Sequence, residues 1–209
     1  NAFVFSSSAA IYGAQPALYL GEDLPPDPIN PYGATKVAFE LALRSYAEAS
    51  ELRAVALRYF NVAGGTERIS ERHTPETHLV PRLLHAAQSG EPFDLYGADY
   101  ATPDGSALRD YVHVSDVAAA NVAAVKHLLK ESTKPGYAAV NIGSGVGTSV
   151  KEAISAVERS TKRMINVQIK PRRAGDPPRL VADISRATSL LGWKPRQSEM
   201  TRIVRSILT

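Results

Sequence analysis

Apolar and polar residues follow two repeating patterns along the chain, and together these patterns predict an α/β protein. Short apolar runs rich in Val, Ile and aromatic residues are typical of buried parallel strands. They lie at residues 3–7, 53–60, 93–96, 109–114, 138–142 and 166–170. Longer segments with apolar residues every three or four positions predict amphipathic helices. These lie at residues 32–50, 79–89, 115–130, 183–191 and 200–208, and in the segment that Ser149-Val150-Lys151-Glu152 opens with a predicted capping box.

Polar loops rich in proline and glycine separate these elements and predict two structural parts. The first is the C-terminal half of a doubly wound, Rossmann-type parallel sheet, formed by residues 1–65 and 113–163. The second is a small α/β substrate-capping lobe, formed by residues 66–112 and 164–209. Because the lobe comes from two stretches far apart in the sequence, we expect these stretches to fold against each other.

Composition narrows the class of protein. The chain has 209 residues, 44% of them hydrophobic, which is enough to bury a sizeable core. No apolar run approaches the roughly 18 residues of a membrane span, so no membrane partner is expected. The net charge of +3 comes from scattered basic residues, which argues against nucleic acid and favours an anionic small molecule. Cysteine is absent, which excludes disulfides and thiol nucleophiles and fits a cytoplasmic location.

Three side chains near the N-terminus have the chemistry to oxidise a secondary alcohol. Ser8 ends the first apolar strand, and Tyr32 and Lys36 follow a proline-rich loop. If Pro31 lies in the first helical turn, Tyr32 and Lys36 occupy one helix face, one turn apart. An ammonium group beside a phenol favours the phenolate, which can take a proton from an alcohol near neutral pH. We therefore predict Tyr32 as the base and Lys36 as its activator, with Ser8 bonded to the same hydroxyl.

The pair of Tyr32 and Lys36 is weak evidence alone, because nine tyrosines permit a chance match on a solvated helix. The preceding stretch, Ser-Ser-Ser-x-x-x-Tyr-Gly, changes this interpretation. Together with Pro-Tyr-Gly-Ala-Thr-Lys, it resembles the nucleotide-sugar branch of the extended short-chain dehydrogenase/reductase family. The resemblance covers essentially the whole chain and implies NAD as the cofactor. It also implies an N-terminally truncated fragment, since the family's glycine-rich opening βαβ unit is not among these residues.

The resemblance also implies which residues hold the cofactor. By this analogy, the residues that contact NAD are Ser6, Ser7, Tyr32, Lys36, Tyr59 and Phe60. Lys36 is expected to hold the nicotinamide ribose, and Phe60 to lie behind the nicotinamide. Asn61, the next residue, is expected to bond the sugar or its phosphate. A core phenylalanine and a turn asparagine are the structural alternatives at these two positions.

Two arginine-containing segments resemble the places where the family holds a diphosphate. Arg109 opens Arg-Asp-Tyr-Val-His-Val-Ser-Asp, and Arg173 opens Arg-Ala-Gly-Asp. A guanidinium can clamp a diphosphate through paired, charge-assisted hydrogen bonds. We therefore expect both arginines at the diphosphate, and the resemblance places Asp176 at a ribose hydroxyl. A solvated basic loop is the alternative for the second segment, and Asp110 and His113 are interpreted as structural partners at the strand end.

Two further segments, Thr-His-Leu-Val-Pro and Asp-Leu-Tyr-Gly, match places where the family holds uracil and the phosphates. The contacts are made there through backbone and side chains. The residues implied as ligand contacts are His78, Leu79, Asp94, Leu95 and Tyr96. Many relatives have Asn at the position of His78, which leaves the role of its side chain open, whereas Tyr96 could stack on a base.

Two other features carry no site prediction. The run Gly-Ser-Gly-Val-Gly at 143–147 lies between a strand and a helix, but its spacing differs from the dinucleotide fingerprint. No acidic residue lies about twenty residues further on to bind a ribose, so a simple turn is the preferred interpretation. The five histidines are dispersed and lack ligand spacing, so no metal site is predicted.

The resemblance implies NAD-dependent epimerisation of a UDP-hexose at C4 through a transient 4-keto sugar. No acidic pair stands in the serine region at Ser7 and Ser8, which disfavours the dehydratases of the same branch. The alternatives are another nucleotide-sugar dehydrogenase, such as a UDP-glucuronate decarboxylase or 4-epimerase, a non-catalytic UDP-sugar-binding fragment, and a scaffold domain. Because the family often pairs through the helix after the serine strand and the helix at 32–50, a homodimer is expected, with the UDP-hexose as the other partner.

Overall fold

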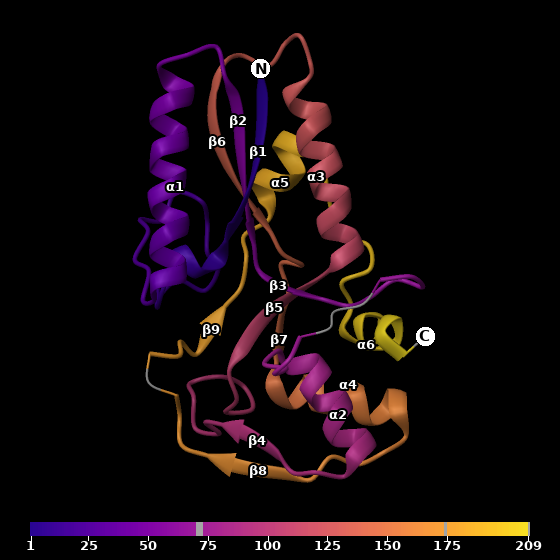
Figure 1. Cartoon of the computed structure of the whole chain (residues 1–209). Helices are drawn as coiled ribbons and strands as arrows, with labels where there is room; N and C mark the ends of the chain where they lie inside the picture. Colours follow the sequence, from indigo (N-terminus) through magenta and orange to yellow (C-terminus); the bar gives the residue numbers. More distant parts are fainter. Residues whose placement is uncertain (70–72, 174, 209) are drawn as a thin grey trace.

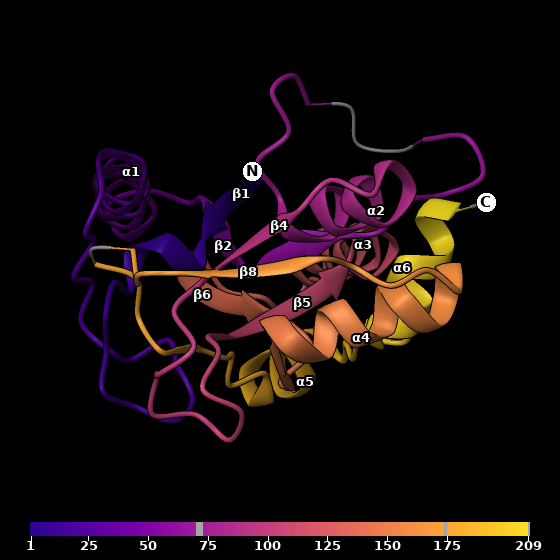
Figure 2. The same ribbon diagram turned by 90° about the horizontal axis from the view of Figure 1, so that it is seen from below.

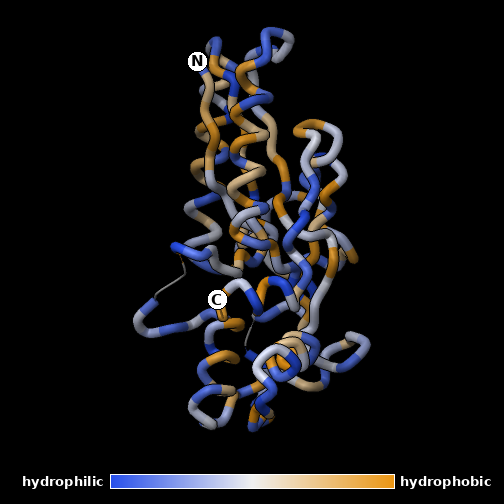
Figure 3. Tube along the Cα trace, turned by 90° about the vertical axis from the view of Figure 1, so that its right-hand side faces the viewer, coloured by the Kyte–Doolittle hydropathy of each residue, from blue (hydrophilic) through white to orange (hydrophobic). Residues whose placement is uncertain are grey.

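A computed structural model describes residues 1–69, 73–173 and 175–208 of the chain. Figure 1 shows an elongated molecule with a layered α/β part at one end and a smaller lobe at the other. In Figure 3 apolar and polar turns alternate along the helices, as expected for helices with one buried face. Within the described residues, no helix combines the length and the apolar character needed to cross a bilayer.

The larger part is built on a parallel three-stranded sheet in the order β1-β2-β6. Its strands are β1 (Ala2–Ser8), β2 (Arg53–Tyr59) and β6 (Gly136–Ile142). Figure 1 shows α1 on one side of this sheet and α3 with α5 on the other. These helices are α1 (Pro31–Glu48), α3 (Val114–Leu128) and α5 (Ser185–Leu191). The parallel strands and the helices on both faces confirm the predicted Rossmann-type half-sheet.

The central position of β2 explains its continuous apolar run. Five consecutive residues of β2 are buried, because helices cover both faces of the sheet. Val55 and Leu57 pack with Val140 of β6, Leu128 of α3 and Trp193, which follows α5. The carboxyl ends of parallel strands meet at one edge of a sheet, and here Ser8 pairs in register with Tyr59.

A second group of short strands surrounds β5 (Leu108–His113) and connects the two parts. β5 pairs in parallel with β3 (Asn61–Ala63) and β9 (Arg179–Leu180), and antiparallel with β7 (Gly147–Ser149). The sequence analysis predicted β5 but not its three partners. They are two or three residues long, so they show no alternating pattern, and pairing with β5 holds them in place.

Among its described residues, the lobe contains three helices and a two-stranded parallel sheet. The helices are α2 (Leu79–Ser89), α4 (Val150–Thr161) and α6 (Met200–Leu208), and the strands are β4 (Phe93–Tyr96) and β8 (Val167–Lys170). Figure 2 shows the three helices gathered at one side of the lobe, with β4 and β8 beside them. The predicted capping box of α4 is confirmed, since Ser149 and Glu152 each accept the other's backbone N–H.

The predicted division into two parts differs from the packing of the apolar cores at two helices, α4 and α5. α4 was assigned to the sheet, but Ile154 and Val157 pack in one core with Leu83 of α2 and Ile203 of α6. The segment of α5 was assigned to the lobe, but Ala187 packs in the sheet core. An amphipathic helix belongs to the part that buries its apolar face. We therefore propose to place α4 in the lobe and α5 with the sheet.

Candidate active site

A cavity of about 1220 Å³ opens where the carboxyl ends of the strands meet the lobe. Open α/β sheets bind ligands at this edge. The predicted site residues that line the cavity are Ser8, Tyr59, Phe60, Asn61, His78, Leu79, Arg173 and Asp176. They come from the strand ends, from the start of α2 and from the loop before β9, so the fold brings distant segments to one ligand-sized space.

Ser8 stands at the turn from β1 into the short 3₁₀ helix η1 (Ala9–Ile11). Its Oγ caps η1 by accepting the backbone N–H of Ala10 at 3.2 Å, while the residue lines the cavity. α1 begins close by, since Gly33 is buried and a Cβ there would lie 2.4 Å from the carbonyl oxygen of Ala10. Only glycine permits this approach, so Gly33 holds the start of α1 against the segment that carries Ser8.

Tyr32 and Lys36 lie on one face of α1, as the spacing predicts. Asn30 caps the helix by accepting the backbone N–H of Gly33 at 2.8 Å, and Pro31 occupies the first turn. The Lys36 Nζ lies 5.4 Å from the centre of the Tyr32 ring and donates to the carbonyl oxygen of Ser6 at 2.9 Å. Tyr32 is 57% exposed, and neither residue is among those that line the cavity.

The predicted cofactor residues at the strand ends differ in what their side chains can reach. Ser7 is buried and its hydroxyl donates to Glu40 Oε1 at 2.5 Å, so this hydroxyl lies in the protein interior. Ser6 Oγ lies on the other face of β1, 3.1 Å from the Tyr59 hydroxyl. Phe60 is buried, yet its surface forms part of the cavity wall. An aromatic wall and exposed hydroxyls beside an ammonium suit the nicotinamide and ribose of a dinucleotide.

A buried ion pair anchors the helix that carries Tyr32 and Lys36. Glu40, one turn after Lys36, accepts from Arg58 of β2 through both carboxylate oxygens, with the shortest contact at 2.7 Å. Burial alone would raise the pKa of Glu40, but hydrogen bonds and the charge of Arg58 outweigh it and lower that pKa. Tyr137 of β6 also donates to Glu40, at 2.9 Å. The sequence analysis missed this network, although a Glu four residues after Lys36 could have pointed to it.

Arg109 and Asp176, which were predicted to meet a diphosphate and a ribose, meet each other in the structure. The Arg109 Nη2 donates to Asp176 Oδ1 at 2.5 Å, and the Arg109 side chain is largely buried. Asp176 lines the cavity, whereas Arg109 lies behind it. Arg109 therefore already holds a carboxylate of the chain itself where a diphosphate was expected.

The remaining predicted ligand contacts lie around the same loop. The Arg173 guanidinium lies 4.1 Å from the centre of the Tyr96 ring, which fits a cation–π contact. Asp94 pairs with Lys170 of the neighbouring strand at 3.5 Å. Leu95 is 2% exposed and belongs to the lobe core. Because its side chain faces away from solvent, only the backbone of Leu95 is available to a ligand.

The glycine-rich run after β6 binds a carboxylate of the chain itself. The backbone N–H groups of Ser144 and Gly145 donate to the buried side chain of Asp110, at 2.5 and 3.0 Å. His113 is the last residue of β5. Its Nδ1 accepts the backbone N–H of Ser115, so the ring proton lies on Nε2, which is 2.9 Å from Ser206 Oγ. Both residues hold strand ends, as the sequence analysis interpreted them.

The fold is that of an α/β protein with a Rossmann-type half-sheet, in which Ser8 stands at a strand end and Tyr32 and Lys36 lie on the helix that follows. A comparison with protein families makes this specific. The chain belongs to the NAD dependent epimerase/dehydratase family, whose model matches residues 1–143.

Individual relatives agree with this assignment. The chain is 46% identical over 209 residues to the UDP-glucose 4-epimerase of Rhizobium leguminosarum bv. trifolii, covering 99% of this chain and 63% of the relative. A crystal structure of the UDP-glucose 4-epimerase from Brucella ovis in complex with NAD superposes with a TM-score of 0.92, at 46% identity and over 99% and 63% of the two chains. The enzyme from Stenotrophomonas maltophila, with bound NAD and formylated UDP-arabinopyranose, gives 0.92 at 36% identity, over 99% and 62%.

Proposed function

We propose that this chain, within a protein as long as its relatives, interconverts UDP-hexoses by NAD-dependent epimerisation at C4. The chain spans 63% of the length of the relative from Rhizobium, so the activity is assigned to the longer protein. The relatives' names supply the reaction, and the residues at the strand ends supply a chemistry that fits it. The observation that carries the proposal is Lys36, whose ammonium lies against the Tyr32 ring and is held by the Ser6 carbonyl.

The proposed reaction begins with proton transfer from the sugar. Tyr32 acts as the general base for the C4 hydroxyl while Ser8 holds the same oxygen by a hydrogen bond. NAD, held beside Lys36 and Phe60, would supply the reversible hydride acceptor for C4. The Tyr32 hydroxyl then gives its proton back to the C4 oxygen once the 4-keto sugar presents its opposite face. Proton and hydride both return, so the substrate is isomerised without net oxidation.

The cofactor would be held on the exposed side of β1 and α1. Lys36 keeps two further N–H donors for ribose hydroxyls after its bond to Ser6. Phe60 offers a flat apolar surface to the nicotinamide ring. The UDP part would occupy the lobe side of the cavity, with its diphosphate near Arg173 and Arg109, and its base near His78 and Leu79.

The decisive experiment assays the full-length protein with UDP-galactose and follows UDP-glucose formation. We expect Tyr32→Phe to lower kcat by about 10²–10⁴-fold, because the step loses its general base. Tyr19→Phe, at an exposed tyrosine outside the site, is the matched control and should leave kcat unchanged. Unchanged turnover in Tyr32→Phe would remove Tyr32 as the base.

The same assay separates the alternative activities. Conversion of UDP-glucuronate, with release of CO₂ or epimerisation, in place of UDP-galactose would favour the other nucleotide-sugar enzymes of this branch. Binding of UDP-glucose without turnover of any sugar would favour a binding module. We expect the 209-residue chain alone to be inactive and the full-length protein to be active.

We also propose that the full-length protein forms a homodimer through α1. This helix carries large apolar side chains that are exposed, including Leu41 and Tyr46. Apolar side chains of this size on a surface helix are typical of an interface.

A further inference from the structure

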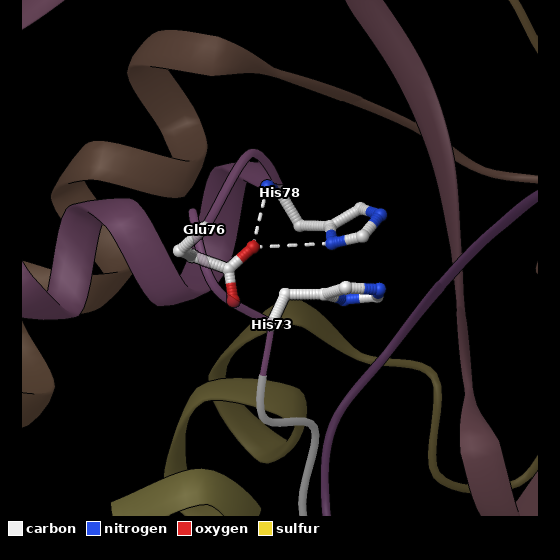
Figure 4. A group of neighbouring side chains, drawn as sticks. All are labelled: His73, Glu76 and His78. Carbon is white, nitrogen blue, oxygen red and sulfur yellow. Dashed lines mark hydrogen bonds and ion pairs between the residues drawn. The ribbon is translucent and has the colours of Figure 1, made fainter.

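Three side chains with metal-binding chemistry meet at the lobe side of the cavity. His73, Glu76 and His78 each offer one ligand atom, and these atoms lie within 4.8 Å of one another. Figure 4 shows the two imidazole rings one above the other, beside the Glu76 carboxylate. Their ring centres are 5.0 Å apart. The sequence analysis predicted no metal site, although the spacing His-x-x-Glu-x-His could have pointed to this group.

The Glu76 carboxylate is held in place by the backbone. Its Oε1 accepts the backbone N–H groups of Thr77 and His78, both at 2.7 Å, and lies 3.1 Å from His78 Nδ1. These bonds all fall on Oε1, so Oε2 keeps its lone pairs for a cation. Because the backbone already holds this carboxylate beside the two imidazoles, little conformational entropy is lost when it binds an ion.

The donor set selects the class of ion. Two imidazole nitrogens and one carboxylate oxygen are ligands that zinc and neighbouring transition metals prefer. Bond lengths of about 2.0–2.2 Å place the ligand atoms of a tetrahedral ion about 3.3 Å apart. In the structure the three ligand atoms lie within 4.8 Å of one another, so side-chain rotations would have to close this spacing around an ion.

We propose that His73, Glu76 and His78 form a three-ligand site for a divalent transition-metal ion, with Zn²⁺ as the preferred occupant. His73 and His78 both line the cavity, so an ion held by them would lie at its wall and could take a water or an anionic oxygen of a ligand as a fourth partner. Mg²⁺ is not expected there, because it takes almost only oxygen ligands. The site does not depend on the proposed epimerase activity.

The test measures metal binding by the full-length protein, in the absence of any sugar. Competition with a chromogenic chelator gives the Zn²⁺ affinity, and the visible absorption of added Co²⁺ reports the geometry of the ligands. We expect one Zn²⁺ per chain and a loss of affinity of at least about tenfold in His73→Ala, Glu76→Gln and His78→Ala. Mg²⁺ should not compete.

His85→Ala is the matched control. His85 is also exposed and lies 3.7 Å from Glu91, but that pair offers only two donors. Its substitution should leave Zn²⁺ binding unchanged. The proposal is overturned if the protein takes no Zn²⁺ from the chelator, if His73→Ala binds as tightly as the parent, or if His85→Ala loses the ion. His73 lies in an exposed loop, so its variant serves the test even where His78→Ala fails to fold.

Discussion

Gly143 lies where the end of β6 meets a buried carboxylate. A Cβ at this position would lie 2.6 Å from Asp110 Oδ2 and 2.8 Å from the Cβ of Ala182. Asp110 cannot move aside, because Ser144 and Ala182 both donate backbone N–H groups to it. We predict that Gly143→Ala lowers the free energy of unfolding by about 2 kcal/mol, as overpacking does. Denaturant titration of the full-length protein measures this change.

Gly21→Ala provides the control for that steric argument. A Cβ at Gly21 would meet nothing within 4 Å, and its φ is not in the left-handed region. We expect no loss there, and at most a gain of about 1 kcal/mol from the stiffer unfolded chain. Similar losses in the two variants would contradict a specific clash at Gly143.

Single residues were predictable where their partners are close in sequence. The capping box of Ser149 and Glu152 follows from a spacing of three residues, and the structure confirms it. Asp110 was predicted only as a structural partner, since Ser144 and Ala182 lie 34 and 72 residues away. The pairing of Arg109 with Asp176 was not foreseen, because each was assigned to a ligand by resemblance.

At the scale of elements, the approach of α1 to η1 sets the place of Tyr32. A Cβ on Gly33 would lie 2.4 Å from the Ala10 carbonyl oxygen and 2.9 Å from the Pro28 side chain. We predict that Gly33→Ala moves the start of α1 away from Ser8 and lowers kcat of the full-length enzyme by about 10²-fold, as a misplacement of about 1 Å can. KM for the UDP-sugar should change little, because the cavity residues of the lobe stay in place.

The Gly33→Ala measurement has its own control and its own contrary outcome. Gly21→Ala adds the same methyl group where nothing lies within 4 Å, so kcat should not change. A rise in KM with unchanged kcat in Gly33→Ala would mean that α1 positions the substrate rather than the base.

The buried pair of Glu40 and Arg58 joins α1 to β2. We predict that Glu40→Gln lowers the free energy of unfolding at neutral pH by about 3–5 kcal/mol, because it leaves a buried guanidinium without its counterion. The pKa of Glu40 is lowered in the folded state by Arg58, against the effect of burial. Its charge therefore adds stability above the unfolded pKa of about 4.5, and this contribution is lost as pH falls through the folded value.

The difference between parent and Glu40→Gln should therefore shrink in acid, which urea titrations at several pH values would measure. Asp23→Asn is the comparison, because Asp23 pairs with Arg186 at 2.8 Å while its side chain is 91% exposed. An exposed pair of this kind contributes at most about 1 kcal/mol. A pH-independent difference for Glu40→Gln would contradict the role assigned to its charge.

Elements with a strong pattern were predictable, and short ones were not. β4 and α6 have the bounds that the sequence predicts, because an apolar run or an amphipathic repeat marks each along its whole length. β3, β7 and β9 exist because β5 offers them hydrogen bonds. No residue pattern of two or three positions carries that information.

At the scale of the whole molecule, the exposed face of α1 carries the proposed dimer. Leu41 is 56% exposed on this helix. We predict that Leu41→Glu shifts the full-length protein from dimer to monomer in sedimentation velocity, because a charge would be buried in the interface. Leu18→Glu, at a leucine in a loop that is 67% exposed, should leave the dimer intact. A dimer that persists in Leu41→Glu would place the interface elsewhere.

At the scale of the whole molecule, the sequence predicted part of the lining of the cavity but not the position of α1 beside it. Resemblance named residues from the strand ends and from the loop before β9, and several of them line one space. It did not indicate that Tyr32 and Lys36 would lie beside the cavity rather than in its wall. That placement depends on how α1 rests on η1, which follows from backbone contacts at Gly33 that no residue spacing encodes.

The contact between Arg109 and Asp176 has a consequence for selectivity. The ion pair of Arg109 and Asp176 carries almost no net charge, so its electrostatic attraction for inorganic phosphate is weak. A nucleoside diphosphate can displace the Asp176 carboxylate from Arg109 and then donate a hydrogen bond to it from a ribose hydroxyl. Bare phosphate has no such hydroxyl. In the proposed complex, Arg109 would thereby favour a nucleoside diphosphate over bare phosphate before any sugar is recognised.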